Sequence, residues 1–170
     1  LRNKMVPNKE GGLTKHRPNS DVLSIYEAAM QYKEENIPLM ILAGKEYGTG
    51  SSRDWAAKGT ALLGVRFVLA ESFERIHRSN LIGMGILPVE FMDNYSADKL
   101  KLSGFETFSI KNIIKEVTPG AILNMDINYL NGINKTIPVL CRIDTNDELD
   151  YYRNGGILHY VLRNLIRDAA

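Results

Sequence analysis

The chain has 170 residues, of which 44% are hydrophobic and 24% are charged, a composition typical of a globular protein with its own core. Its 21 basic and 20 acidic residues leave a net charge of +1, which does not indicate bulk binding to nucleic acid. No apolar run approaches the roughly 20 residues that a membrane-spanning helix needs, so no membrane partner is expected. The single cysteine, Cys141, favours a reducing compartment, and we expect a cytoplasmic location.

Strands alternate with helices in the first half of the chain. Residues 2–17 are polar and are predicted to form an extended lead-in loop. Ser24 and Glu27 have the spacing of a capping box, which predicts a helix to about Asn36 that ends before Pro38. The further predictions are a strand at 38–43, a helix at 52–63, a strand at 65–70, a helix at 73–81 and a strand at 86–91. This alternation predicts an α/β protein with a parallel or mixed sheet covered by helices.

The pattern changes after residue 92. Residues 105–110, 121–129 and 136–143 are predicted to be antiparallel strands, the last two forming a hairpin across Asn131-Gly132. Residues 147–153 and 157–166 are predicted to form two terminal helices. Because no repeat or internal linker is visible, we expect residues 1–170 to form one domain. Because the chain begins with Leu1, we expect that domain to be a fragment of a longer polypeptide.

Residues 43–59, AGKEYGTGSSRDWAAKG, are the most informative stretch. An apolar strand leads into a glycine-rich turn that ends at Ser51, Ser52 and Arg53, where a helix is predicted to begin. Two hydroxyls, free backbone N–H groups and a guanidinium at a helix N-terminus favour binding of an anion, in particular a carboxylate. Ser51 and Asp54 also have the spacing of a capping box. The apolar residues of the helix are expected to form its buried face; they are Trp55, Ala56, Leu62 and Leu63.

Two familiar glycine motifs do not fit this turn. A Walker A loop needs Lys directly after its last glycine, but Gly50 is followed by Ser51. A dinucleotide fingerprint needs a third glycine where this chain has Arg53, and the side chain there would keep a pyrophosphate away. A small polycarboxylate therefore fits better than a nucleotide. The spacing alone also allows a simple capped turn with a surface arginine.

The stretch 43–59, followed by LGVR at 63–66 and AESFERIHRSNLIGMGILP at 70–88, resembles the C-terminal swivelling domain of the aconitase family. The similarity is greatest to the branch that contains bacterial aconitase A and the cytosolic aconitase/iron regulatory proteins. NGGIL at 154–158 fits the same domain, so the resemblance covers nearly the whole chain. It implies a swivelling β/β/α domain of a lyase of the tricarboxylic acid cycle. That enzyme interconverts citrate and isocitrate through cis-aconitate by dehydration and rehydration.

The resemblance also implies the roles of three residues. Ser51 would be the catalytic base, which as an alkoxide removes a proton from a substrate carbon. Ser52 and Arg53 would hold the substrate carboxylates. A serine anion needs stabilisation, and a helix N-terminus beside a cation provides it. Arg53 can grip a carboxylate with two parallel hydrogen bonds, which a lysine cannot.

Aconitases bind a [4Fe–4S] cluster through three cysteines, whereas this chain has only Cys141. One thiolate cannot hold such a cluster. The resemblance therefore implies that no cofactor is bound by this chain, and that other domains of the same polypeptide bind the cluster in the full-length enzyme. The remaining substrate arginines and the acid for the leaving hydroxyl would lie there as well, so we expect the domain alone to be inactive.

Other residues could contribute to such a site. His77 is either a proton carrier or a helix residue hydrogen-bonded locally, and the second reading is favoured because the sequence places no acidic or nucleophilic partner beside it. Four basic residues could form a positive rim that steers a tricarboxylate; they are Lys45, Arg53, Arg75 and Arg78.

Several alternatives share this turn. They are 2-methylcitrate or 2-methylisocitrate dehydratase, homoaconitase and the small subunit of isopropylmalate isomerase. The long match to the aconitase form and the start at Leu1 both count against the last of these. A different class of function is binding of an RNA stem-loop, as in iron regulatory proteins, in which Arg53 would meet a phosphate or a base edge. The net charge of +1 gives that reading no independent support.

Overall fold

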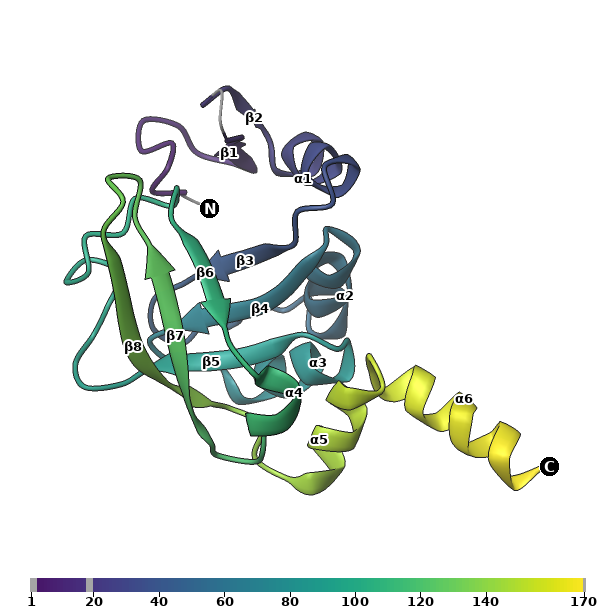
Figure 1. The fold of residues 1–170 in the computed structure, drawn as a ribbon. Coiled ribbons are helices and arrows are strands. Elements are labelled where there is room, and N and C mark those ends of the chain that lie inside the picture. The colour runs from purple at the N-terminus through teal and green to yellow at the C-terminus, as the bar shows by residue number, and fades with distance from the viewer. Residues whose placement is uncertain (1–2, 18–19, 170) are drawn as a thin grey trace.

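The structure is a computed structural model that describes residues 3–17 and 20–169. Its strands are β1 (Leu13–Lys15), β2 (Val22–Ser24), β3 (Leu39–Leu42), β4 (Val65–Ala70), β5 (Leu87–Phe91), β6 (Thr107–Ile110), β7 (Ile122–Asn128) and β8 (Asn134–Cys141). Its helices are α1 (Ile25–Glu34), α2 (Asp54–Leu62), α3 (Arg75–Gly83), α4 (Ile113–Glu116), α5 (Asn146–Arg153) and α6 (Ile157–Asp168). Figure 1 shows a strongly curled main sheet with helices α2 and α3 on one side of it.

The main sheet is mixed, as predicted. Its six strands have the order β3-β4-β5-β8-β7-β6, and β1 pairs with β2 in a separate antiparallel sheet. Strands β3, β4 and β5 run parallel to one another, whereas β8, β7 and β6 pair antiparallel. The α/β class with an antiparallel second half is therefore confirmed, and so is the β7–β8 hairpin.

Local sequence signals predicted the start of α1 correctly but missed the shortest elements. At α1 the predicted capping box is present: Ser24 Oγ accepts from the Glu27 N–H at 3.1 Å, and Glu27 Oε2 accepts from the Ser24 N–H at 3.0 Å. The predicted lead-in loop is wrong in part, because it contains β1. Helix α4 was also missed. Three-residue strands and a four-residue helix are too short to produce a recognisable hydrophobic period.

The prediction for the buried face of α2 is wrong. Trp55 is 68% exposed and Leu62 is 69% exposed, whereas Ala57 is fully buried. Lys58 Nζ lies 4.2 Å from the centre of the Trp55 ring, a cation–π contact at the surface. Helix α2 thus packs through its small residues and turns its large apolar side chains outward.

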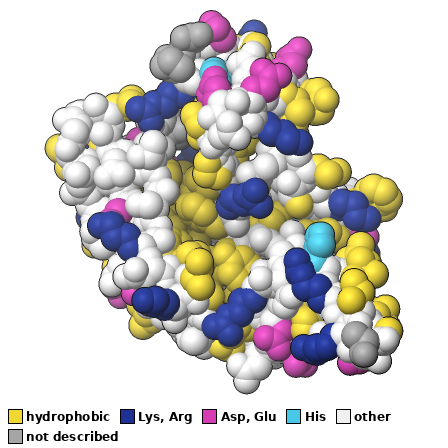
Figure 2. Space-filling model, turned by 45° about the vertical axis from the view of Figure 1, so that its right-hand side comes forward, with side chains coloured by type: hydrophobic (Ala, Val, Ile, Leu, Met, Phe, Trp, Pro, Cys, Tyr) yellow, Lys and Arg dark blue, Asp and Glu magenta, His cyan; other side chains and the backbone are white. Residues whose placement is uncertain are grey.

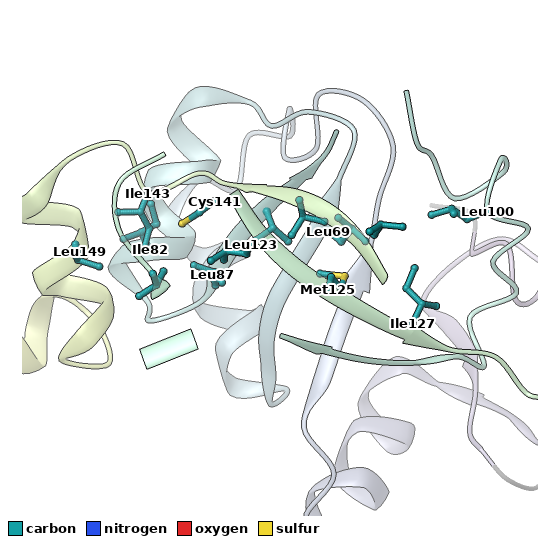
Figure 3. Packing of buried hydrophobic residues seen from close by; sticks show 14 residues of the cluster. Leu69, Ile82, Leu87, Leu100, Leu123, Met125, Ile127, Cys141, Ile143 and Leu149 are labelled. Atoms are coloured by element: carbon teal, nitrogen blue, oxygen red, sulfur yellow. The ribbon is translucent and has the colours of Figure 1, made fainter. Parts of the chain in front are cut away.

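Two clusters of buried side chains hold the main sheet. The larger cluster fills the curl of the sheet (Figure 3), and alternate residues of β7 and β8 enter it in register, with Met125 opposite Ile137 and Leu123 opposite Val139. The smaller cluster joins the sheet to its helices; it consists of Ala57, Val65, Val68, Leu81 and Ile86. Strand β4 contributes to both clusters, with Leu69 in the larger and Val68 in the smaller. Helices α2 and α3 are therefore fixed relative to the carboxyl ends of β3 and β4.

A buried ion pair fastens α3 to α5. Arg78 is only 7% exposed, and its two terminal nitrogens donate to the two carboxylate oxygens of Glu148 at 2.9 and 2.8 Å. Arg78 Nη1 also donates to the Arg142 carbonyl at 2.7 Å. Burial raises the pKa of Glu148, but hydrogen bonds from Arg78 and from the Asp144 N–H outweigh it, so the pKa lies below its ordinary value. The inclusion of Arg78 in a substrate-steering rim was therefore wrong, because its charge is already paired.

We predict that Glu148→Ala destabilises the chain by about 3–5 kcal/mol, because the buried Arg78 guanidinium loses its two carboxylate hydrogen bonds and keeps only one ion pair, the longer contact of its Nε with Asp144, at 3.5 Å. The double variant Arg78→Met/Glu148→Leu should lose clearly less, since neither charge then remains buried. Urea denaturation of the wild type and both variants measures these free energies. If the double variant were less stable than Glu148→Ala, the loss of stability would come mainly from the missing Arg78–Glu148 interaction and not from a buried charge without its partner.

Candidate active site

The loop between β3 and α2 lies against the segment that follows β4. Because β3 and β4 are parallel, both segments leave the same edge of the sheet. The Tyr47 N–H donates to the Ser72 carbonyl at 2.9 Å, and the Glu74 N–H donates to the Tyr47 carbonyl at 2.9 Å. The Glu46 N–H also donates to Ser72 Oγ at 2.8 Å. These bonds fix the first half of the glycine-rich loop before it reaches α2.

A pocket of about 350 Å³ lies where this loop meets the start of α3. Its lining consists of Gly48, Thr49, Gly50, Ser51, Arg53, Glu74, Ile76 and His77. The volume is near the lower end of the range for small-molecule sites, about 300–1,000 Å³. The pocket thus suits a small polar molecule better than a dinucleotide.

The structure brings two of the three predicted site residues together. Ser51 and Arg53 both line the pocket, whereas Ser52 is next to it in the chain but does not line it. All three side chains are exposed, and none of them bonds to another side chain of the described residues. Their hydroxyl and guanidinium groups are therefore available to a ligand.

Arg53 has an unusual backbone conformation. It is the N-cap residue of α2, with φ 47° and ψ −123°, and it makes no side-chain capping bond. The predicted capping box between Ser51 and Asp54 is therefore wrong, and the helix begins at Asp54 rather than at Ser52. A non-glycine residue in such a region costs about 1–3 kcal/mol, and such strain is concentrated at functional sites.

The N-termini of two helices meet at the pocket and differ in their electrostatics. At α3 the Glu74 side chain occupies the N-terminus, where its Oε2 accepts from the His77 N–H at 2.8 Å. Hydrogen bonds from the backbone N–H groups of Ile76 and His77 lower the pKa of Glu74. No side chain caps α2, so the backbone N–H groups of its first turn, beside Ser51 and Arg53, can meet an anion, although Asp54 in the same turn offsets part of the positive end of the helix dipole.

His77 also lines the pocket, although the sequence favoured a locally hydrogen-bonded helix residue. It is only 4% exposed, and neither ring nitrogen has a hydrogen-bond partner among the described residues. The prediction that His77 is hydrogen-bonded locally is therefore wrong for its ring. Burial lowers the pKa of His77, and the charge of Glu74 offsets this only in part, which favours the neutral imidazole.

The His77 ring is held by residues of the glycine-rich loop. The Tyr47 ring meets it edge-on at 5.1 Å between centres. Gly48 has φ +99°, and a Cβ added there would lie 2.2 Å from His77 Cγ. No sequence signal could have found this contact, because it joins a loop to a helix almost thirty positions further along the chain.

The described residues do not fit an iron–sulfur cluster. Cys141 is buried in β8 within the larger core cluster, and burial raises the pKa of its thiol, which disfavours the thiolate that a metal requires. No group of three or more His, Cys, Asp or Glu in the described ranges could hold a metal ion.

None of the helices within the described ranges is both long and apolar enough to cross a membrane.

Comparison with known proteins points to one family. The chain is 57% identical over 167 residues to aconitate hydratase A of Escherichia coli K12, with 98% of the chain and 19% of the relative covered. It is 58% identical over 165 residues to aconitate hydratase A of Legionella pneumophila, with 97% and 18% covered. The Thermus thermophilus enzyme of the same name is 49% identical over 169 residues, with 99% and 19% covered. The chain therefore spans about a fifth of the length of these relatives.

A solved structure supports the fold. The crystal structure of a 3-isopropylmalate dehydratase from Methanocaldococcus jannaschii matches with a TM-score of 0.51 at 23% identity, covering 86% of this chain and 83% of that one. At this identity the likeness concerns the fold alone. The sequence pattern of the aconitase C-terminal domain matches residues 1–94, which include the whole pocket. The chain belongs to the aconitase C-terminal domain family.

Proposed function

We propose that the chain is the substrate-binding and catalytic-base domain of an aconitate hydratase, a hydro-lyase that interconverts citrate and isocitrate through cis-aconitate. The observation that carries this proposal is the shared pocket of Ser51 and Arg53 at the uncapped N-terminus of α2. The names of the relatives supply the reaction. Because this chain spans about a fifth of their length, the other domains of the polypeptide would complete the active site.

The residues of the chain divide the work by their chemistry. Arg53 binds a substrate carboxylate through two hydrogen bonds, and Ser52 assists it from the adjoining turn. Ser51 Oγ, as the alkoxide, takes the proton from the carbon next to a carboxylate. The positive end of α2 and the Arg53 guanidinium stabilise the alkoxide before the proton arrives. In the reverse direction Ser51 returns the same proton.

The [4Fe–4S] cluster of the aconitase family would be bound by the other domains, where it would polarise the leaving hydroxyl. The sequence has a single cysteine, which is buried in the core, and no group of ligands in the described part of the chain fits a metal. We therefore propose that this chain contributes the base and the carboxylate clamp only, and that catalysis requires the full-length protein.

Two alternatives remain open. The turn would serve 2-methylcitrate or 2-methylisocitrate dehydratase equally well, because the pocket residues address carboxylates and the proton rather than a methyl group. RNA binding would use the exposed Arg53 once the cluster is lost. A salt titration of RNA affinity with the cluster-free full-length protein, against an unrelated hairpin, separates specific RNA binding from general phosphate attraction.

We predict that Ser51→Ala in the full-length enzyme lowers kcat by about 10²–10⁴-fold, the usual contribution of general-base catalysis. KM should change much less, because Arg53 and the helix N-terminus remain. Tm should hardly change, because the structure gives Ser51 no capping bond. Both quantities are measured on one preparation. A lower Tm with near-normal kcat would make Ser51 a structural residue and remove it as the base.

We predict that Arg53→Lys mainly raises KM, because the charge stays but the two-pronged grip is lost; a charge-assisted bond is worth about 1.5–3 kcal/mol. Arg53→Gly should bind substrate still more weakly and yet raise Tm, because glycine tolerates φ 47° without strain. Steady-state kinetics and thermal melts test the pair. An unchanged KM in both variants would exclude Arg53 as the clamp.

We predict that His77→Phe reduces the loss of stability on acidification. The pKa of His77 in the folded protein lies below its ordinary value of 6.5, so the unfolded state binds the extra proton first. The free energy of unfolding that depends on neutral His77 is therefore fully present well above pH 6.5. It decreases as the pH falls through 6.5, where the unfolded state begins to take up the proton. Thermal melts of the wild type and of His77→Phe at pH 7.5 and at pH 5.5 give the loss of stability of each protein between the two pH values. If His77 were instead a proton carrier, kcat of His77→Phe at pH 7.5 would fall by about 10²-fold or more.

A further inference from the structure

Helix α6 carries an apolar stripe that its own domain leaves uncovered. None of its described residues is buried. Six large apolar side chains of the helix are exposed; they are Ile157, Leu158, Val161, Leu162, Leu165 and Ile166. Figure 1 shows α6 extending away from the rest of the molecule, and Figure 2 shows hydrophobic side chains gathered at the lower right, on the side that carries α6.

The stripe faces away from the body of the domain. Tyr160 and Asn164 are the two least exposed positions along the middle of the helix, and the Tyr160 ring packs on Tyr151 at 5.3 Å between centres. At about 100° per residue, the stripe centres between Leu158 and Leu165, which is roughly 130° around the helix from the direction of Tyr160 and Asn164. Only the first residue of the stripe lies near the domain, where Ile157 Cγ2 would be 3.9 Å from a Cβ added to Gly83; the centre of the stripe points away from it.

Packing against the described residues stabilises α6 only weakly, because none of its described side chains is fully buried. A helix of 12 residues is marginal in water, and most helices are stabilised by packing an amphipathic face. The polar side of α6 carries His159, Arg163 and Arg167, and Arg163 already donates to the Asn154 carbonyl at 2.6 Å. Two arginines fall short of the strongly cationic face of a helix that lies on a membrane. A protein surface is therefore the fitting cover.

The lengths of the relatives indicate which protein surface covers the stripe. Aconitate hydratase A of Escherichia coli and of Thermus thermophilus match 98% and 99% of this chain, but only 19% of their own length lies in the match. The helix is thus shared with proteins about five times longer. A surface on the same polypeptide is present at a high effective concentration, on the order of millimolar for short linkers, which a second copy does not reach.

We propose that the apolar stripe of α6 is the surface by which this domain docks on the remainder of its own polypeptide. The docking surface there would be apolar, to match the six exposed side chains of the stripe. The proposal rests on the proposed function only in requiring a longer parent protein of this family. It does not depend on Ser51, Arg53 or the chemistry at the pocket.

Photo-crosslinking in the full-length protein identifies the occupant. Leu165→p-benzoylphenylalanine places the probe at the centre of the stripe, and His159→p-benzoylphenylalanine places it on the polar side as the matched control. The expected result is crosslinks from position 165 to residues of the same chain outside 1–170, with few from position 159. Crosslinks to a second copy, shown by a doubled mass, or equal labelling from both positions, would overturn the proposal.

Hydrogen exchange tests whether the contact is stabilising. In the full-length protein, Leu165→Glu should speed exchange of the α6 amides by about 10–100-fold, the factor that corresponds to losing the burial of one leucine. His159→Glu adds the same charge on the polar side and should leave exchange unchanged. Equal exchange in the two variants would contradict the proposal. Neither measurement needs turnover, so an inactive but docked protein would refute the proposed function and leave this inference standing.

Discussion

The contact between the Gly48 backbone and the His77 ring determines where the candidate site lies. A side chain at position 48 would occupy the same space as the imidazole, so only glycine lets the loop descend onto α3. The Tyr47 backbone is bonded to Ser72 and to Glu74 in the same place. With its first half fixed beside the start of α3, the loop carries Ser51 and Arg53 along the pocket on its way to α2. The two helices are in turn held by the cluster that includes Ala57 and Leu81.

The pocket retains features that a domain selected for stability alone would avoid. Arg53 adopts a backbone conformation suited to glycine, α2 has no side-chain cap, and both nitrogens of the buried His77 lack partners in the described structure. Each of these features costs free energy, and all three lie around one pocket. Their coincidence is typical of a binding site, because an uncapped helix N-terminus keeps backbone N–H groups for a ligand and the unpaired His77 nitrogens can still form hydrogen bonds.

Local chemistry made much of the fold predictable. The capping box at Ser24, the turn at Asn131-Gly132 and the apolar run of β4 depend on neighbours in sequence, and each prediction agrees with the structure. The same capping signal failed at Ser51, because the positive φ of Arg53 moves the helix start past the serine. Resemblance to the aconitase family placed Ser51 and Arg53 in one site, which spacing alone left open.

Tertiary contacts account for the other failures. Arg78 looks like any surface arginine until the fold brings Glu148 against it, seventy positions further along the chain. His77 looks like an ordinary helix residue until Gly48 covers it. Periodicity finds an apolar face on a helix but does not say which surface covers that face. That is why Trp55 and Leu62 were expected in the core and lie outside it.

The exposed apolar faces and the incomplete chemistry have a common explanation. Helices α2 and α6 both turn large apolar side chains outward, and the pocket between α2 and α3 would, in the proposed roles of Ser51 and Arg53, supply a base and a clamp but no acid for a leaving hydroxyl. A domain that worked alone would bury those faces and surround its substrate. A domain that closes on a larger body needs its pocket open and its outer faces apolar until closure. On this view the exposure of α6 and the openness of the pocket follow from one requirement, that both surfaces be completed by the same polypeptide.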